Sequence, residues 1–179
     1  NVGSGTAKYD LDLSGIIALG EAVVVSKTLT SIDLSKCGIS VAGVTEVAKF
    51  ISAGAALTTL RCGSNLGMVG ELDRYGYLNT PDVHIEALQQ LLNALKPSGV
   101  TDLDISAIGI GPTGADRVAD YVRDAKASLT SLRCGSNSGI VGELDKYGRL
   151  KTPDAHIEAL QQLLDALKPS AVTDLDISA

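Results

Sequence analysis

LTTLRCGSN, at residues 57–65, is the stretch that decides the fold of this chain. It has apolar residues at its first, fourth and sixth positions and an asparagine at its ninth. The same spacing starts four more times, as LTSIDLSKC at 29–37, VTDLDISAI at 100–108, LTSLRCGSN at 129–137 and VTDLDIS at 172–178. Alternate inward-facing residues are typical of a short strand, and an Asn or Cys side chain can bond neighbouring backbone in the turn that follows. The sequence therefore predicts five short strands of one kind.

A longer period contains these strands. The segments 57–107 and 129–179 align without a gap at an offset of 72, and 42 of their 51 positions are identical. A clean period of this length is typical of stacked repeat units and not of a domain built around one catalytic pocket. The strand starts are separated by 28, 43, 29 and 43 residues, so a short unit alternates with a long one.

The short units have a recognisable signature after the strand. A Gly-x-x-x-x-Gly stretch (38–43 and 109–114) is followed by apolar residues at helical spacing. The residues expected on the buried helix face are Val44, Val47, Ala48 and Ile51, and Ala115, Val118, Ala119 and Val122. With the strand motif L-x-x-L-x-L-x-x-N/C, the whole chain resembles the ribonuclease-inhibitor-like class of leucine-rich-repeat proteins. The resemblance implies an α/β solenoid, a right-handed βα superhelix with a curved parallel sheet on its concave face and helices on its convex face.

The spacing divides the chain into one solenoid segment of successive units. These are a partial repeat (1–28), a short repeat (29–56), a long repeat (57–99), a short repeat (100–128), a long repeat (129–171) and a truncated repeat (172–179). Residues 1–9 look like a shortened inserted segment and 15–26 like its helix. Neither end has the polar cap that closes a solenoid, so we expect a fragment of a longer repeat protein.

The long units carry an inserted segment, LGMVGELDRYGYLNTPD at 66–82 and SGIVGELDKYGRLKTPD at 138–154. Each ends in Thr-Pro-Asp, which predicts a helix start with Thr80 or Thr152 as the N-cap. The helix HIEALQQLLNALK (84–96) should end before Pro97. Its expected buried residues are Ile85, Leu88, Leu91, Leu92 and Leu95.

The middle outward position of each strand forms a column of alternating charge on the expected concave face: Asp33, Arg61, Asp104, Arg133 and Asp176. Neighbouring parallel strands lie about 4.8 Å apart, so each acidic residue should sit beside a basic one. Such a charge ladder can be a patterned groove for a peptide or protein, or a structural ladder that neutralises itself.

The inserted segments are the leading candidates for partner binding, because long insertions in a repeat array often carry function. The candidate residues are Glu71, Asp73, Tyr75, Tyr77, Glu143, Asp145, Tyr147 and Arg149. The alternative is that Val69, Leu72, Tyr75 and Leu78, with their counterparts 72 residues later, cover the sheet or pack on the next copy.

Composition argues against several classes of function. The net charge of −6 and the absence of a Lys/Arg cluster argue against nucleic-acid binding. No apolar run approaches the roughly 18 to 20 residues needed for membrane insertion. Cys37, Cys62 and Cys134 recur at related positions without CxxC spacing, so we expect free buried thiols, which favour an intracellular, cytoplasmic setting.

No catalytic, cofactor-binding or metal site is expected. His84 and His156 occupy equivalent repeat positions, whereas a catalytic histidine is usually unique and paired with a nucleophile. The string Gly109-x-Gly111-x-x-Gly114 matches a nucleotide-binding pattern, but it falls in a repeat turn. The acidic GELD-x-YG loops lack a calcium-binding Asp series.

These observations predict a non-enzymatic scaffold for protein–protein interaction, with a protein partner or self-association. The alternative is a structural protein whose repeats stack into an array or filament. Some relatives of the class stimulate GTPases, but no residue of this sequence specifically supports that activity.

Overall fold

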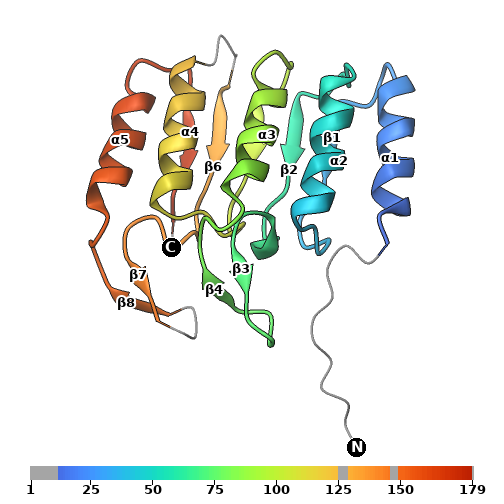
Figure 1. Ribbon diagram of the computed structural model, residues 1–179. Helices are drawn as coiled ribbons and strands as arrows, with labels where there is room; N and C mark the ends of the chain where they lie inside the picture. Colours follow the sequence, from blue (N-terminus) through green and yellow to red (C-terminus); the bar gives the residue numbers. More distant parts are fainter. Residues whose placement is uncertain (1–11, 125–128, 146–148, 179) are drawn as a thin grey trace, which may run out of the picture.

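The computed structural model describes residues 12–124, 129–145 and 149–178. Its main sheet has five parallel strands in the order β1-β2-β5-β6-β9. These strands are β1 (Ser31–Asp33), β2 (Thr59–Arg61), β5 (Asp102–Asp104), β6 (Ser131–Arg133) and β9 (Asp174–Asp176). The helices are α1 (Ser14–Val25), α2 (Val41–Ser52), α3 (Ile85–Leu95), α4 (Pro112–Asp124) and α5 (Ile157–Leu167). The helices lie side by side over one face of the sheet (Figure 1). The predicted α/β architecture is thus confirmed.

The core lies between the sheet and the helices. The central residue of each of the first four strands points inward and is at most 7% exposed: Ile32, Leu60, Leu103 and Leu132. Opposite them, all eight residues predicted for the buried helix faces of the short units are buried. Leu88, Leu91, Leu92 and Leu95 of α3 are buried too, while Ile85 is partly buried and packs against the same cluster.

Turn asparagines join neighbouring units, as the motif predicts. The Asn65 amide nitrogen donates to the carbonyls of Leu34 (2.9 Å) and Cys62 (2.8 Å), and its oxygen accepts from the Ile39 amide (3.1 Å). Asn137 repeats this arrangement one long period later, with Ile105 and Ile110 in place of Leu34 and Ile39. Each asparagine therefore ties a long unit to the short unit before it. The expectation of a buried thiol is wrong for Cys37, which is exposed and donates its Sγ hydrogen bond to the Ser35 carbonyl within its own turn (3.5 Å).

Each inserted segment forms a two-stranded antiparallel hairpin. The first hairpin is β3 (Glu71–Leu72) with β4 (Leu78–Thr80), preceded by a 3-10 turn η1 (Leu66–Met68), and the second is β7 (Glu143–Leu144) with β8 (Leu150–Thr152). Both follow the ends of sheet strands, so they extend from the same edge of the molecule (Figure 1).

The predicted helix start at Thr-Pro-Asp is wrong. Thr80 ends β4 opposite Glu71, Thr152 likewise ends β8, and the helices begin at Ile85 and Ile157. The reason is the aspartate of the motif, which adopts a left-handed backbone conformation (φ 60° at Asp82 and 59° at Asp154) that a right-handed helix excludes. Pro81 therefore belongs to a turn outside the helix.

Candidate functional site

The sheet face opposite the helices carries the predicted column of charges. The strand register places Arg61 between Asp33 and Asp104, and Arg133 between Asp104 and Asp176. The ion pairs, however, go to the neighbouring column. Arg61 Nη2 lies 3.1 Å from Asp102 Oδ2, and Arg133 bonds Asp102 Oδ1 (2.8 Å) and Asp174 Oδ2 (3.1 Å). The ladder of direct middle-column pairs is therefore corrected to a diagonal one.

The middle-column aspartates are engaged by their own turns. The Oδ1 atoms of Asp33, Asp104 and Asp176 each accept a hydrogen bond from the serine amide two residues later, at 2.8, 2.9 and 2.9 Å. Hydrogen bonds from the Ser35 side chain and backbone lower the pKa of Asp33, and those from Ser178 lower the pKa of Asp176. Both arginines are already paired, and the middle-column carboxylates bond the amides of their own turns. Among the described residues, this face therefore offers a ligand few unpaired charged groups.

The first hairpin has an ordered loop. Asp73 Oδ1 accepts the amides of Tyr75 (2.8 Å) and Tyr77 (2.9 Å), and the Asp73 amide donates to the Tyr77 carbonyl (2.8 Å). Asp73, one of the candidates for partner contact, therefore also holds this loop in shape. Gly76 takes the positive φ of 86° that the tight loop requires.

The loop of the first hairpin presents two tyrosines to solvent. Tyr75 is 67% exposed and Tyr77 is 61% exposed, whereas Val69 and Leu78 are buried at 1% and 7%. The two interpretations of the inserted segment thus apply to different residues, since the aliphatic residues pack and the tyrosines do not. Arg74 lies with its guanidinium 4.6 Å from the centre of the Tyr75 ring, and its Nη2 is 2.6 Å from the Tyr75 hydroxyl. Glu71, at the base of the hairpin, is exposed.

The second hairpin repeats the backbone geometry with different side chains. The Asp145 amide donates to the Arg149 carbonyl (2.8 Å), and Asp145 Oδ1 accepts the Arg149 amide (3.0 Å). Glu143 is exposed and its Oε2 accepts from the Thr152 hydroxyl (3.2 Å). Arg149 stands where the first hairpin has Tyr77. The candidate Tyr147 lies outside the described residues.

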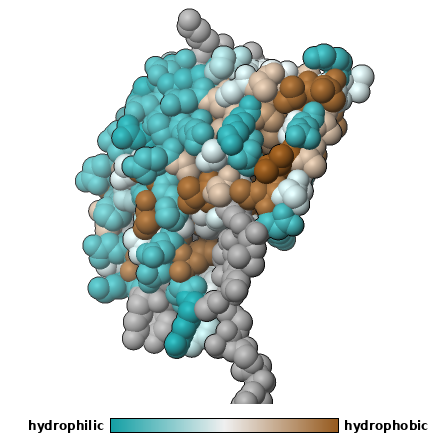
Figure 2. All heavy atoms as spheres, turned by 45° about the vertical axis from the view of Figure 1, so that its right-hand side comes forward, coloured by the Kyte–Doolittle hydropathy of each residue, from teal (hydrophilic) through white to brown (hydrophobic). Residues whose placement is uncertain are grey.

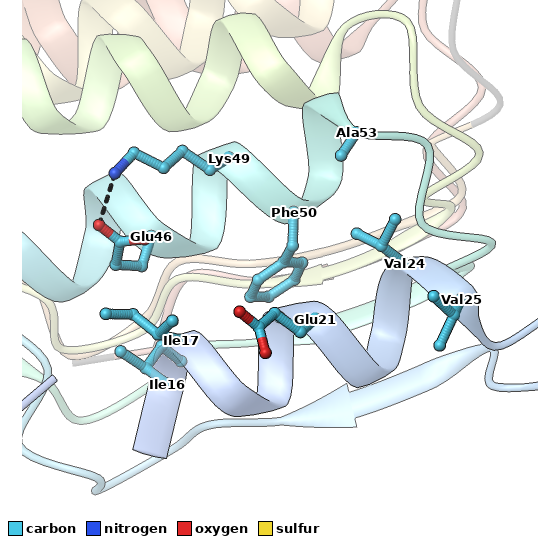
Figure 3. Close-up of a pocket in the computed structure, with 10 residues that line it drawn as sticks. Ile16, Ile17, Glu21, Val24, Val25, Glu46, Lys49, Phe50 and Ala53 are labelled. Atoms are coloured by element: carbon cyan, nitrogen blue, oxygen red, sulfur yellow. Dashed lines mark hydrogen bonds and ion pairs between the residues drawn. The ribbon is translucent and has the colours of Figure 1, made fainter. Parts of the chain in front are cut away.

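An apolar groove lies between α1 and α2, and no motif of the sequence predicts it. It has a volume of about 410 Å³ and is lined chiefly by Ile16, Ile17, Gly20, Val24, Val25, Phe50 and Ala53. Figure 3 shows the Phe50 ring pointing from α2 toward α1, with Glu21, Glu46 and Lys49 around it. A side chain at Gly20 would contact this ring, since its Cβ would lie 3.1 Å from Phe50 Cδ1.

This groove belongs to a larger apolar surface at the α1 end of the molecule. Figure 2, turned toward that end, shows hydrophobic residues gathered there beside a largely hydrophilic helix face. Ile17 is 42% exposed and Val25 is 75% exposed. The signal in the sequence was the stretch SGIIALGEAVVV, which has apolar residues around the whole helix and not along a single stripe.

Two of the cysteines and the backbone of both histidines are held within the packing of the fold. Burial raises the pKa of Cys62 and of Cys134 to about 12, so both thiols are protonated at neutral pH and are poor nucleophiles. The backbone amides of His84 and His156 donate to the carbonyls of Val69 and Val141, at 2.8 and 3.1 Å, where they anchor the turn before each helix. Within the described ranges, no group of three or more His, Cys, Asp or Glu residues could hold a metal ion.

In the part of the chain that the structure describes, no helix has both the length and the apolar character needed to span a bilayer.

Comparison with known proteins supports the fold. A solved structure of the tropomodulin C-terminal domain from Caenorhabditis elegans superposes with a TM-score of 0.60 at 10% sequence identity, covering 94% of this chain and 83% of that one. That domain has a leucine-rich-repeat-type fold, and the likeness extends this fold type to the present chain. At this identity it shows the fold alone. No protein-family model matches the sequence, and no curated protein matches it.

Proposed function

We propose that this protein is a non-enzymatic leucine-rich-repeat scaffold that binds a protein partner through its first hairpin. The observation that carries the proposal is the pair of exposed tyrosines, Tyr75 and Tyr77, on a loop held by Asp73. Tyrosine is enriched among residues that dominate binding energy, because it buries a large area at a low cost in side-chain entropy. A loop already fixed by hydrogen bonds also loses less entropy on binding.

The sheet face is a weaker candidate for the partner-binding surface than the first hairpin. Asp102 accepts hydrogen bonds from both arginines, so a partner there would have to displace existing ion pairs. We further propose that the repeats follow the right-handed superhelix of the ribonuclease-inhibitor-like class, in which such insertions lie at one rim of the array.

The test is a partner capture that compares matched variants. A Tyr75→Ala, Tyr77→Ala double variant should keep the fold, because both side chains are exposed, and should bind captured partners about 30-fold or more weakly. Arg117→Ala, an exposed substitution on α4, is the control and should leave binding unchanged. Equal capture by the tyrosine variant and the parent would reject the hairpin as the binding surface.

Self-association is the second candidate, favoured by apolar side chains exposed at both ends of the sheet. Ile17 and Val25 are exposed at one end, and Leu175 and Ile177 are 38% and 41% exposed at the other. Direct pairing of β9 with β1 of another copy would place Asp176 beside Asp33, which is unfavourable. Contact through α1, with its exposed Ile17 and Val25, would avoid this strand pairing. Sedimentation across a wide concentration range tests this candidate, which predicts species larger than a monomer.

A further inference from the structure

Helix α4 begins with a cap that another repeat supplies. Asp82, between β4 and α3, accepts the Gly111 amide at its Oδ1 (2.8 Å) and the Gly114 amide at its Oδ2 (3.1 Å). Its own backbone amide donates to the Gly109 carbonyl (3.1 Å). The first amides of a helix have no partner inside the helix and form its positive end, so a carboxylate is well suited to them.

The two glycines are required for this contact. A Cβ atom at Gly111 would lie 2.7 Å from Asp82 Oδ2, and one at Gly114 would lie 2.6 Å from Asp82 Oδ1. Any side chain at either position would collide with the carboxylate. The stretch Gly111-Pro-Thr-Gly114 is therefore the signature of a helix that accepts a cap from the long unit before it.

The second copy has the same Thr-Pro-Asp turn, but in the described residues no helix of the α4 type lies beside it. Asp154 follows the same Thr-Pro pair, has a φ of 59° against 60° at Asp82, and is exposed. In the described residues no helix follows β9 to receive its carboxylate. The aspartate thus keeps the conformation that the first copy uses for capping.

The surface around Asp154 carries exposed apolar side chains, whereas the equivalent side chains around Asp82 are buried. Leu150 is 47% exposed against 7% for Leu78, and Ile177 is 41% exposed against 0% for Ile105. Ile157, on the adjoining turn of α5, is 47% exposed. In the first copy, α4 packs beside α3 and the next strand pairs with β5.

We propose that the face formed by Asp154, β8, α5 and β9 is a binding surface for a helix of the α4 type joined to β9. Such a helix starts with Gly-Pro-x-Gly and presents small and β-branched residues, as α4 does with Ala115, Val118, Ala119 and Val122. The same molecule contains the occupied form of this surface, in which Asp82 caps α4. The proposal is independent of the hairpin tyrosines.

The other end of a second copy does not fit this surface. The first turn of α1 is capped locally, since the Ser14 amide donates to Asp12 Oδ1 (2.8 Å), so it does not need Asp154. Helix α1 also begins Ser-Gly-Ile-Ile, without the paired glycines. Strand β1 would in addition bring Asp33 beside Asp176, whereas every strand pair of the sheet sets an aspartate beside an arginine at this position.

The test adds a copy of residues 108–124 after Ala179, so that β9 continues as β5 does. The extension should raise the free energy of unfolding measured by urea denaturation. Asp154→Gly, which removes the carboxylate but permits the positive φ, should lower the folding equilibrium constant of the extended chain by roughly 2- to 30-fold, the range measured when a capping side chain is truncated to alanine. The same substitution should have little effect in the parent chain. Asp82→Gly is the matched control and should have a similar cost in both chains.

A second variant and a second measurement make the outcome decisive. Replacing both copied glycines by alanine should abolish the gain from the extension, because each Cβ would meet the Asp154 carboxylate. Amide hydrogen exchange should show protection of the two copied glycine amides, and Asp154→Gly should remove it. An extension that adds no stability and whose glycine amides exchange freely would overturn the proposal. So would a dimer of the parent chain that Ile157→Asp dissociates, since a second copy would then be the occupant.

Discussion

The two long copies, 57–107 and 129–179, share 42 of 51 residues but not the same environment. Leu103 in the first copy is fully buried, while its counterpart Leu175 is 38% exposed. The Asp102 side chain is 20% exposed and bonds two arginines, whereas Asp174 is 61% exposed and bonds one. Because the residues are the same, the difference comes from the neighbouring unit. In a repeat array, the contribution of a residue to folding stability therefore depends on the neighbouring unit that it packs against.

The copies are alike on one side and unlike on the other. Asn65 and Asn137 make the same bonds because both reach back to a preceding short unit that is present in each case. Asp82 and Asp154 differ because they face the following unit, and within the described residues Asp82 bonds a helix there whereas Asp154 does not. Side chains that face the preceding unit therefore make the same hydrogen bonds in both copies. The aspartate that faces the following unit makes its helix-capping bonds in the first copy.

The largest expected effect comes from truncating the paired core leucines. Leu103→Ala should destabilise the protein by about 2–5 kcal/mol, because it leaves a cavity in the centre of the sheet. Leu175→Ala should cost about 1 kcal/mol, since β9 is the last strand and the side chain is already partly in water. Urea denaturation of the two variants measures the difference. Equal losses would mean that the two copies have equivalent surroundings in solution.

A smaller effect is expected from a buried hydroxyl. Tyr121 on α4 is 1% exposed and its hydroxyl has no hydrogen-bond partner among the described residues. Burial raises the pKa of Tyr121 to about 12. Tyr121→Phe should therefore stabilise the protein by about 1 kcal/mol, as the unpaired group is removed. The other short unit already has Phe50 at this repeat position.

The control for this substitution is Tyr75→Phe on the first hairpin, where the residue is 67% exposed and the hydroxyl pairs with the exposed Arg74 side chain. Its melting temperature should match that of the parent. A loss of stability in Tyr121→Phe would show that the hydroxyl has a partner in solution.

Much of the fold followed from local pattern. The strand motif located all five parallel strands, and helical spacing located the buried faces of α2, α3 and α4, because burial in a repeat array imposes a periodic choice of residues. The start of α3 was missed because Thr-Pro-Asp satisfies local capping preferences. Asp82 instead caps a helix 29 residues away from it in sequence, and nothing in the residues next to Thr80 marks such a long-range bond.

The candidate site was predictable only in part. Strand register could be derived from the motif, so the order of charges on the sheet was foreseen. The choice of Asp102 over Asp104 as the partner of Arg61 depends on side-chain reach and on the turn at Ser106, which spacing does not encode. The exposure of Tyr75 against the burial of Leu78 likewise depends on how the hairpin folds over Gly70, where a Cβ atom would collide with Leu78.

The smallest expected effect is a pH dependence that compares the first and last strands. The pKa of Asp33 lies below its ordinary value of 3.8 because the Ser35 side chain and amide bond its carboxylate, and Ser178 does the same for Asp176. A folded pKa below the unfolded one gives stability that is present above pH 3.8 and is lost as the pH falls through the folded pKa. NMR titration of the carboxyl carbons should find both midpoints below 3.8.

Ser35→Ala sharpens this comparison, because it removes the largest cause of the shift at one end only. The midpoint of Asp33 should rise toward 3.8, while that of Asp176 stays where it is in the parent chain. The backbone bond from residue 35 remains, so the rise should be incomplete. An unchanged Asp33 midpoint would mean that the backbone amide alone holds the carboxylate. The turn geometry shared by both strands would then set the pKa, whatever side chain follows.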